Sequence, residues 1–278
     1  MNRAILTILL LLSVTALHSQ PKITIKEKSL PIFEKIVVSD MLQISVVRDK
    51  ANSIKVTADD DGHKSLEIKV KSGVLYIYQN GRAQLNFTPS VANIHKAVID
   101  QKIVVTTAQP IERFTLSGNA FVSYSDPNPL KALGIKADDS SDFEGTLTCQ
   151  TLSVNLTKNS GADISGTIEK FKITADSSVM RINDVNIQTA DITLTGKSRL
   201  NATGKTNILM LNVLQQSRFE GIGFEATEAK VDVLNRSDAF FKATKRLILT
   251  AKDRAHVVCT GLPEVTKDVS PDCKIKIR

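Results

Sequence analysis

The sequence predicts an all-β protein, a parallel β-helix or β-solenoid of about 19-residue coils preceded by an N-terminal antiparallel strand region. Three observations predict it. Apolar-x-apolar triplets recur at nearly constant spacing over residues 113–262. Tryptophan is absent and aromatic residues make up 5% of the chain, so the core must be built from Ile, Val and Leu, which favours strands. Beyond the N-terminal segment, no long stretch has the periodicity of an amphipathic helix.

The first segment, residues 1–19, has the pattern of a secretory signal peptide. Arg3 supplies the positive charge, Ala4–Val14 form an apolar stretch, and Ser19 is the small residue before the expected cleavage point. No later segment approaches the roughly 20 apolar residues of a membrane-spanning helix. We therefore expect an exported protein of the periplasm, cell surface or extracellular space, with no transmembrane segment after signal cleavage.

The next segment, residues 20–112, is expected to be a β-strand region that caps the solenoid. Leu42–Val46 alternates between apolar and polar residues, as a half-buried strand does. Ser72–Gly73 lies between two such stretches and predicts a hairpin, and Asn80–Gly81 predicts a further turn. One short helical turn is expected within 88–98.

The repeat occupies residues 113–262. Successive triplet starts are 21, 19, 19, 19, 19, 20 and 18 residues apart, at Phe114, Ile135, Val154, Ile173, Ile192, Leu211, Val231 and Leu249. A second apolar residue usually follows eight positions later, at Val122, Phe143, Ala162, Leu200, Phe219, Ala239 and Val257, with Ile182 one residue late. Small and polar residues between the two positions predict corners. Coils of this kind stack about 4.8 Å apart, because each one needs its neighbours to bury its apolar residues.

The tail, residues 263–278, is expected to cap the other end of the solenoid. It contains Pro263 and Pro271 and ends in a lysine-rich stretch. Prolines and lysines are the residues that discourage pairing at an exposed edge strand.

Four stretches of the chain resemble the putative auto-transporter adhesin head domain, or GIN domain, a family of exported proteins common in Bacteroidetes-type bacteria. The stretches are Phe33–Ser39, Val56–Asp60 with Gly73–Ile77, Phe114–Ala120 and Val257–Pro263. The resemblance covers nearly the whole chain after the signal peptide. It implies an all-β solenoid with an N-terminal strand region, and it implies no catalytic or binding residues. The chain departs from the family pattern at its later corners, which are more charged.

The formal net charge is +7. With the repeat as a frame, five cations are expected along one edge of the later coils, a candidate binding site for acidic glycan: Lys197, Arg199, Arg218, Arg236 and Arg254. The alternative is a solvated charged edge that discourages aggregation. Nucleic acid is excluded as a partner, because the basic residues are not interleaved with aromatic ones.

Two acidic clusters were candidates for chemistry. Asp59–His63 contains three carboxylates, but it lacks the ligand spacing of a calcium loop and is interpreted as a polar turn. Asp138–Asp142 lies at a corner, and stacking could bring Lys158 or Asn159 of the next coil beside it. Parallel β-helix polysaccharide lyases use carboxylates with calcium and a basic residue that abstracts a proton. Turn geometry is the simpler interpretation. Nucleophile motifs, metal-ligand spacings and phosphate-binding loops are absent, so no enzyme activity, metal or cofactor is predicted.

The chain has three cysteines, and export permits disulfides. Cys259 and Cys273 are close in sequence and form a candidate bridge. Cys149 is then the candidate free thiol, and three buried thiols are the alternative.

Together, these observations predict an exported, non-catalytic module of the cell envelope or surface. An adhesin-like role is expected, with glycan or an envelope protein as partner. The alternatives are a carbohydrate-active β-helix enzyme and a purely structural or envelope-sensing protein.

Overall fold

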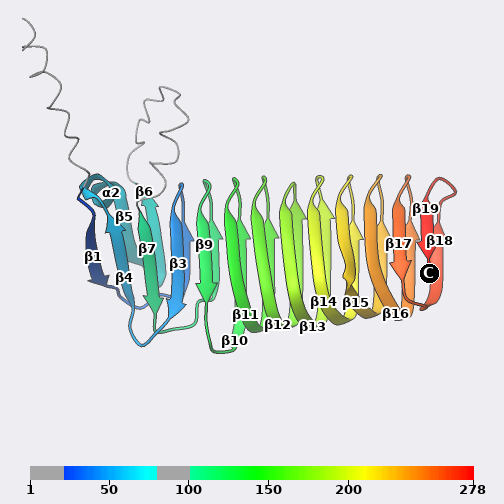
Figure 1. The fold of residues 1–278 in the computed structure, drawn as a ribbon, viewed down its shortest axis with the longest axis horizontal. Helices are drawn as coiled ribbons and strands as arrows, with labels where there is room; N and C mark the ends of the chain where they lie inside the picture. Colours follow the sequence, from blue (N-terminus) through cyan, green and yellow to red (C-terminus); the bar gives the residue numbers. More distant parts are fainter. Residues whose placement is uncertain (1–21, 80–100) are drawn as a thin grey trace, which may run out of the picture.

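A computed structural model shows an elongated solenoid of stacked coils (Figure 1) and describes residues 22–79 and 101–278. Each coil passes through two faces of the solenoid, here called sheet 1 and sheet 2, and in the middle coils one long strand bends from sheet 2 into sheet 1. The predicted signal peptide, the Asn80–Gly81 turn and the helical turn at 88–98 lie outside the described residues. No helix among the described residues is long and apolar enough to cross a membrane.

The predicted repeat is confirmed in sheet 1. All eight triplet starts pair in register from Phe114 to Leu249, and every one of them is buried. Strands alternate buried and exposed side chains, so one face of each lines the core and the other faces solvent. The strands of these coils are β8 (Arg113–Leu116), β9 (Phe121–Ser125), β10 (Leu130–Ala137), β11 (Asp142–Leu156), β12 (Gly161–Asp176), β13 (Val179–Thr195), β14 (Arg199–Val213), β15 (Arg218–Val233), β16 (Asp238–Ala251) and β17 (His256–Thr260).

The second apolar column lies in sheet 2 and is confirmed except at one coil. Val122, Phe143 and Ala162 are in register, but the next member is Met180 rather than Ile182. The corner before Met180 is one residue shorter than its neighbours, so the apolar position comes early rather than late.

The corners from sheet 1 to sheet 2 are tight turns with left-handed backbone conformations. Most of them contain two consecutive residues with positive φ, such as Asp139 and Ser140 or Asn235 and Arg236. Small and polar residues tolerate this conformation best, which accounts for the composition of the corners. Behind six successive corners lies a buried serine, and these form a ladder along the molecule: Ser141, Ser160, Ser178, Ser198, Ser217 and Ser237.

The serine ladder should contribute unequally to stability. Ser198 Oγ accepts a hydrogen bond from the Ser178 N–H (3.1 Å) and donates one to the Thr195 carbonyl (2.6 Å). Ser198→Ala should therefore lower the free energy of unfolding by about 1–3 kcal/mol. Ser141 is the matched control, because its buried Oγ has no hydrogen-bond partner and its replacement by alanine should be close to neutral. Equal losses in urea unfolding would contradict this account.

The N-terminal region differs from a purely antiparallel cap, because two of its strands form a coil of the solenoid. β2 (Lys35–Val38) lies in sheet 1 between β6 and β8, and β3 (Gln43–Arg48) lies in sheet 2 between β7 and β9. All four of these pairings are parallel. The coil is thus inserted between two coils that come later in the sequence. Its outer neighbours are β6 (Val74–Gln79) and β7 (Lys102–Thr107).

Antiparallel strands cover the N-terminal end of this stack. In sheet 2, β4 (Ser53–Ala58) pairs with β7 and is covered by β1 (Thr24–Ser29). In sheet 1, β5 (Leu66–Lys71) pairs with β6 in the hairpin predicted at Ser72–Gly73, where both turn residues have positive φ. A short helix, α2 (Asp60–Ser65), joins β4 to β5.

The C-terminal residues form the last coil. β18 (Glu264–Val269) pairs with β16, and β19 (Lys274–Ile277) pairs with β17. Lys267 is in register with the core residue Leu249 and is exposed, so a charge stands at an inward position of the terminal coil. An inward charge of this kind discourages further strand addition.

Candidate functional site

The outer face of sheet 2 is hollowed along several coils, and we call this surface the polar groove. One hollow has a cavity volume of about 550 Å³ and spans β9 to β14. A second hollow of about 400 Å³ shares Glu144 and Asp163 with the first and reaches β3. The outward side chains that line the two hollows are Ser45, Phe121, Ser123, Ser125, Asp142, Glu144, Thr146, Asp163, Ser165, Val179, Arg181, Asn183 and Asn201.

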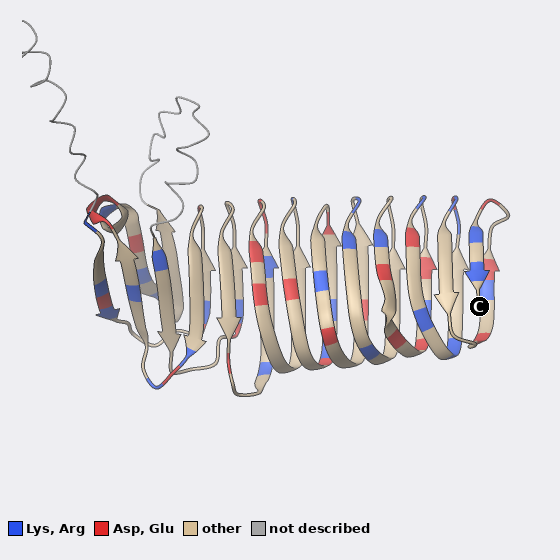
Figure 2. Cartoon of the chain, in the orientation of Figure 1, with Lys and Arg blue, Asp and Glu red and all other residues tan. Residues whose placement is uncertain are grey.

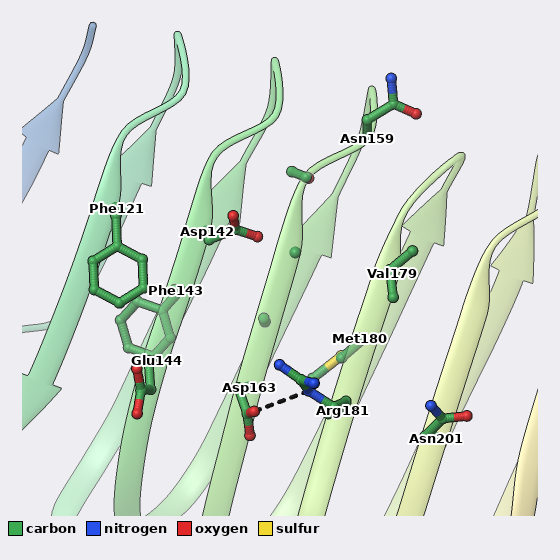
Figure 3. A pocket seen from close by; sticks show the side chains of 13 residues that line it. Phe121, Asp142, Phe143, Glu144, Asn159, Asp163, Val179, Met180, Arg181 and Asn201 are labelled. Carbon is green, nitrogen blue, oxygen red and sulfur yellow. Dashed lines mark hydrogen bonds and ion pairs between the residues drawn. The ribbon is translucent and has the colours of Figure 1, made fainter. Parts of the chain in front are cut away.

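The lining of the larger hollow (Figure 3) includes Gly161, where β12 has no side chain. Gly161 is in register with Asp142 on one side and Val179 on the other. A Cβ atom at this position would overlap Asp142 Oδ1, so the carboxylate leans over the glycine. We call the space above Gly161 the notch.

Hydrogen bonds across the coils fix the middle of the polar groove. Asp163 accepts from Arg181 Nε at 3.1 Å, an ion pair, and from Asn183 Nδ2 at 2.6 Å. Thr146 and Ser165 hydroxyls lie 2.8 Å apart. Arg181 is therefore the cation of this surface, and its charge is already compensated.

Asp142 differs from Asp163 in its electrostatics. Partial desolvation raises the pKa of Asp142 above its usual value, and the nearby Arg181 opposes this shift. No hydrogen bond or ion pair from the Asp142 carboxylate to another described residue is present. Its oxygens are thus free to accept from a ligand.

The five predicted cations divide into two rows. Lys197, Arg236 and Arg254 occupy equivalent corner positions, with Gln216 between the first two. Arg199 and Arg218 lie on sheet 2, in register with each other. Figure 2 shows Lys and Arg at the corners of the later coils and Asp and Glu on β11 and β12.

Arg218 is not available as a free cation. It forms ion pairs with Glu220 (2.5 Å) and Asp238 (3.1 Å), and its guanidinium lies 4.6 Å from the centre of the Phe240 ring. Hydrogen bonding to Glu220 raises its pKa further. The remaining four form no ion pair with any described residue. The structure therefore places three of the five along the row of corners and the other two beside it on sheet 2, where only Arg199 is unpaired.

The two acidic clusters have structural roles. Asp59 is the N-cap of α2, and its side chain accepts from the Gly62 N–H at 2.7 Å. At the other cluster, Asp139 forms an ion pair with Lys158 of the next coil at 3.2 Å, as the stacking of coils predicts. Over residues 22–79 and 101–278, no group of three His, Cys, Asp or Glu side chains is placed to hold a metal ion.

The predicted Cys259–Cys273 bridge is wrong, because all three cysteines are free thiols. Lys274 pairs with His256, and Ile277 pairs with Cys259, so Cys273 lies about four residues along the strand from Cys259. At about 3.3 Å per residue, this separation exceeds the roughly 7 Å that a disulfide can span. Burial raises the pKa of both the Cys149 and the Cys259 thiols.

Sequence reasoning included Asp142 and Asn159 among corner residues but missed the polar groove. The groove could have been recognised from one outward position of the repeat on sheet 2. In successive coils this position carries Glu144, Asp163 and Arg181, all of which are charged. These residues are 19 and 18 positions apart, so the repeat frame could have aligned them.

The fold and its open polar face define a β-solenoid with a lateral surface accessible to ligands. The family model described as "Putative auto-transporter adhesin, head GIN domain" matches residues 32–199 and 174–263. The chain therefore belongs to this family, in agreement with the resemblance seen in the sequence. No curated protein matches the chain.

Solved structures share the fold. A putative adhesin from Parabacteroides merdae has a TM-score of 0.69 at 14% identity, covering 92% of this chain and 96% of its own. A putative adhesin from Parabacteroides distasonis has a TM-score of 0.68 at 18% identity, covering 93% and 98%. A third structure, a putative lipid binding protein from the same species, has a TM-score of 0.61 at 16% identity, covering 92% and 97%.

Proposed function

We propose that this protein is an exported, non-catalytic, adhesin-like module of the cell envelope or surface that binds glycan along the polar groove. The observation that carries the proposal is the continuity of the hollow across successive coils. Ser45, Glu144 and Asn201 mark its extent from β3 to β14. At about 4.8 Å per strand, five spacings extend roughly 24 Å, enough for several sugar rings.

The chemistry of the lining suits sugars. Glycans present many hydroxyl groups, which donate and accept hydrogen bonds, and the groove offers hydroxyls, amides and carboxylates in rows. Phe121 adds a half-buried aromatic ring on the outer face of β9, against which the apolar face of a sugar can pack. A few polar groups around an apolar contact are the usual composition of a small-molecule site.

The shape of the surface favours binding over catalysis. The groove is an open face on a sheet, whereas enzymes that hydrolyse or cleave sugars exclude water and position an acid and a base around the bond. Asp163, which would be one candidate acid or base, is held by Arg181 and Asn183.

The alternative is a carbohydrate-active enzyme in which Asp142, with its raised pKa, acts as the acid beside Glu144. Incubation with glycans followed by an assay for new reducing or unsaturated ends separates the two functions. The proposal expects binding without product, and turnover lost on Asp142→Asn would establish the enzyme instead.

The binding test uses the purified protein against immobilised neutral and acidic polysaccharides. We expect retention of at least one glycan class. Retention that falls steeply with salt would favour acidic glycan at the corner of Lys197, Arg236 and Arg254, because exposed charges are screened. Retention that resists salt would favour the polar groove. Retention of neither class would refute glycan binding and favour an envelope protein as the partner.

A further inference from the structure

We infer that the polar groove selects uncharged sugar units and that the notch above Gly161 is where one sugar ring is seated. This inference rests on the proposed glycan binding and deepens it by naming the ligand class and the position. Three features of the notch support it: its shape, its hydrogen-bonding groups and its charge.

The shape of the notch comes from one missing side chain. Along this row of sheet 2, Phe121, Asp142 and Val179 project outward on either side of Gly161. Gly161 is buried and lines the hollow, so the notch has backbone as its floor. Two apolar groups, the Phe121 ring and the exposed Val179 side chain, stand toward its two ends.

The hydrogen-bonding groups around the notch come from several coils. Asp142 offers a carboxylate that accepts from no other described residue, and Glu144 lies on the same strand. Asn159 at the corner and Asn201 on β14 add amides that can both donate and accept. A ring that carries hydroxyls on its edge and C–H groups on its faces satisfies both the polar and the apolar parts of this lining.

The charge of the notch disfavours acidic sugars. Asp142 and Glu144 form no ion pair with a described residue, whereas Arg181 is paired with Asp163. Within the lining of the notch, a carboxylate, sulfate or phosphate on the ligand would face unpaired negative charge and no unpaired cation. Arg199, an unpaired cation in the same row, lies one coil beyond Val179. Like-charge juxtaposition in a partly desolvated site is unfavourable, so the ligand class is neutral.

Two substitutions test the notch. Gly161→Ala places a methyl group where the Asp142 carboxylate now lies, so the carboxylate must move away from the notch. The backbone φ of Gly161 is compatible with alanine, and the nearest backbone atom, the Val179 carbonyl oxygen, is 3.3 Å away, so the fold should tolerate the change. Asp142→Asn removes the charge but keeps the shape.

A matched control is available on the other sheet. Gly134 lies on β10 in sheet 1, and a Cβ atom there would have its nearest neighbour at 3.7 Å. Gly134→Ala therefore adds the same methyl group without touching the polar groove.

Asp142→Asn should not destabilise the protein above the pKa of the Asp142 carboxyl. Because the folded-state pKa is raised, ionisation of Asp142 as pH rises through that value costs stability, and the amide avoids this cost.

The experiment measures binding of neutral and acidic hexasaccharides by calorimetry, with thermal melting of each variant as the folding control. Cello-, manno- and chito-oligosaccharides serve as neutral probes, and oligogalacturonate serves as the acidic probe. At least one neutral probe should bind, and Gly161→Ala and Asp142→Asn should each weaken that binding about tenfold or more, as for a lost hydrogen bond to a charged group. Gly134→Ala should leave it unchanged, and oligogalacturonate should not compete.

The outcomes distinguish a failure of the notch from a failure of glycan binding itself. Neutral binding that survives both substitutions would overturn the notch but leave glycan binding intact. Competition by oligogalacturonate with the unsubstituted protein would contradict the selection against acidic sugars. Binding of oligogalacturonate that appears only after Asp142→Asn would support it. Failure of every probe to bind would refute the proposed function itself.

Discussion

Gly204→Ala is expected to lower the free energy of unfolding by roughly 3 kcal/mol or more. Gly204 lies at an irregularity between β13 and β14 and has φ of +119°, which L-residues avoid. A Cβ atom there would overlap the backbone carbonyl oxygen of Val185 in the adjacent coil, and a backbone atom cannot move aside as a side chain can. Urea unfolding of the variant measures the loss.

Two other glycines separate the causes of this effect. Gly73 also has a positive φ, +73°, but nothing lies within 4 Å of its Cβ position. Gly73→Ala should therefore cost only the conformational strain, roughly 1–2 kcal/mol. Gly134 has neither strain nor a close neighbour, and its alanine variant should be near neutral. If Gly204→Ala lowers the free energy of unfolding no more than Gly73→Ala does, the close approach of the Val185 carbonyl to Gly204 is refuted.

Ile192→Ala is expected to cost about 2–5 kcal/mol. Ile192 is fully buried in sheet 1, and coils on both sides of it, at Ile173 and Leu211, depend on its contacts. Removal leaves a cavity that neighbouring coils cannot fill, because stacked strands hold their spacing.

Ile275→Ala is the matched control for this prediction. Ile275 occupies the last coil, is only partly buried and has a neighbouring strand on one side only, β17. Its loss should be well below that of Ile192, and hydrogen exchange should increase mainly in β18 and β19, since terminal repeats open locally. A similar loss at both positions would mean that the molecule unfolds as one unit without weaker ends.

The periodic part of the fold was predictable because it depends on local pattern. The eight triplet starts pair in register, since one buried column requires one residue type at one spacing. The exception is instructive. The corner before Met180 is one residue shorter, so Met180 occupies the position expected for Ile182. Both residues are apolar, so the sequence pattern does not distinguish a shortened corner from a lengthened one.

The N-terminal coil was not predictable in the same way. β2 and β3 each pair on both sides with strands more than 30 residues away, and no local pattern indicates such partners. The disulfide failed for a related reason, because closeness in sequence between Cys259 and Cys273 does not determine their places along paired strands.

For the candidate site, the sequence revealed charge but not its compensation. Arg218 was counted with the cations, yet Glu220 two residues on and Asp238 one coil on neutralise it. The notch depends on Gly161, and a glycine at an outward position draws no attention until the side chains on either side are placed.

The inserted coil of β2 and β3 has a consequence for the order of assembly. A chain delivered from its N-terminus brings out residues 35–48 before either of the coils that flank them. β2 and β3 therefore wait unpaired for β6 and β7, at residues 74–79 and 102–107, and gain their second neighbours only with residues 113–125. The later coils face no such delay, because each finds its predecessor already in place. The N-terminal end therefore closes through several non-local pairings, whereas the remainder can be added coil by coil. Loop-closure entropy makes the N-terminal pairings the slow step.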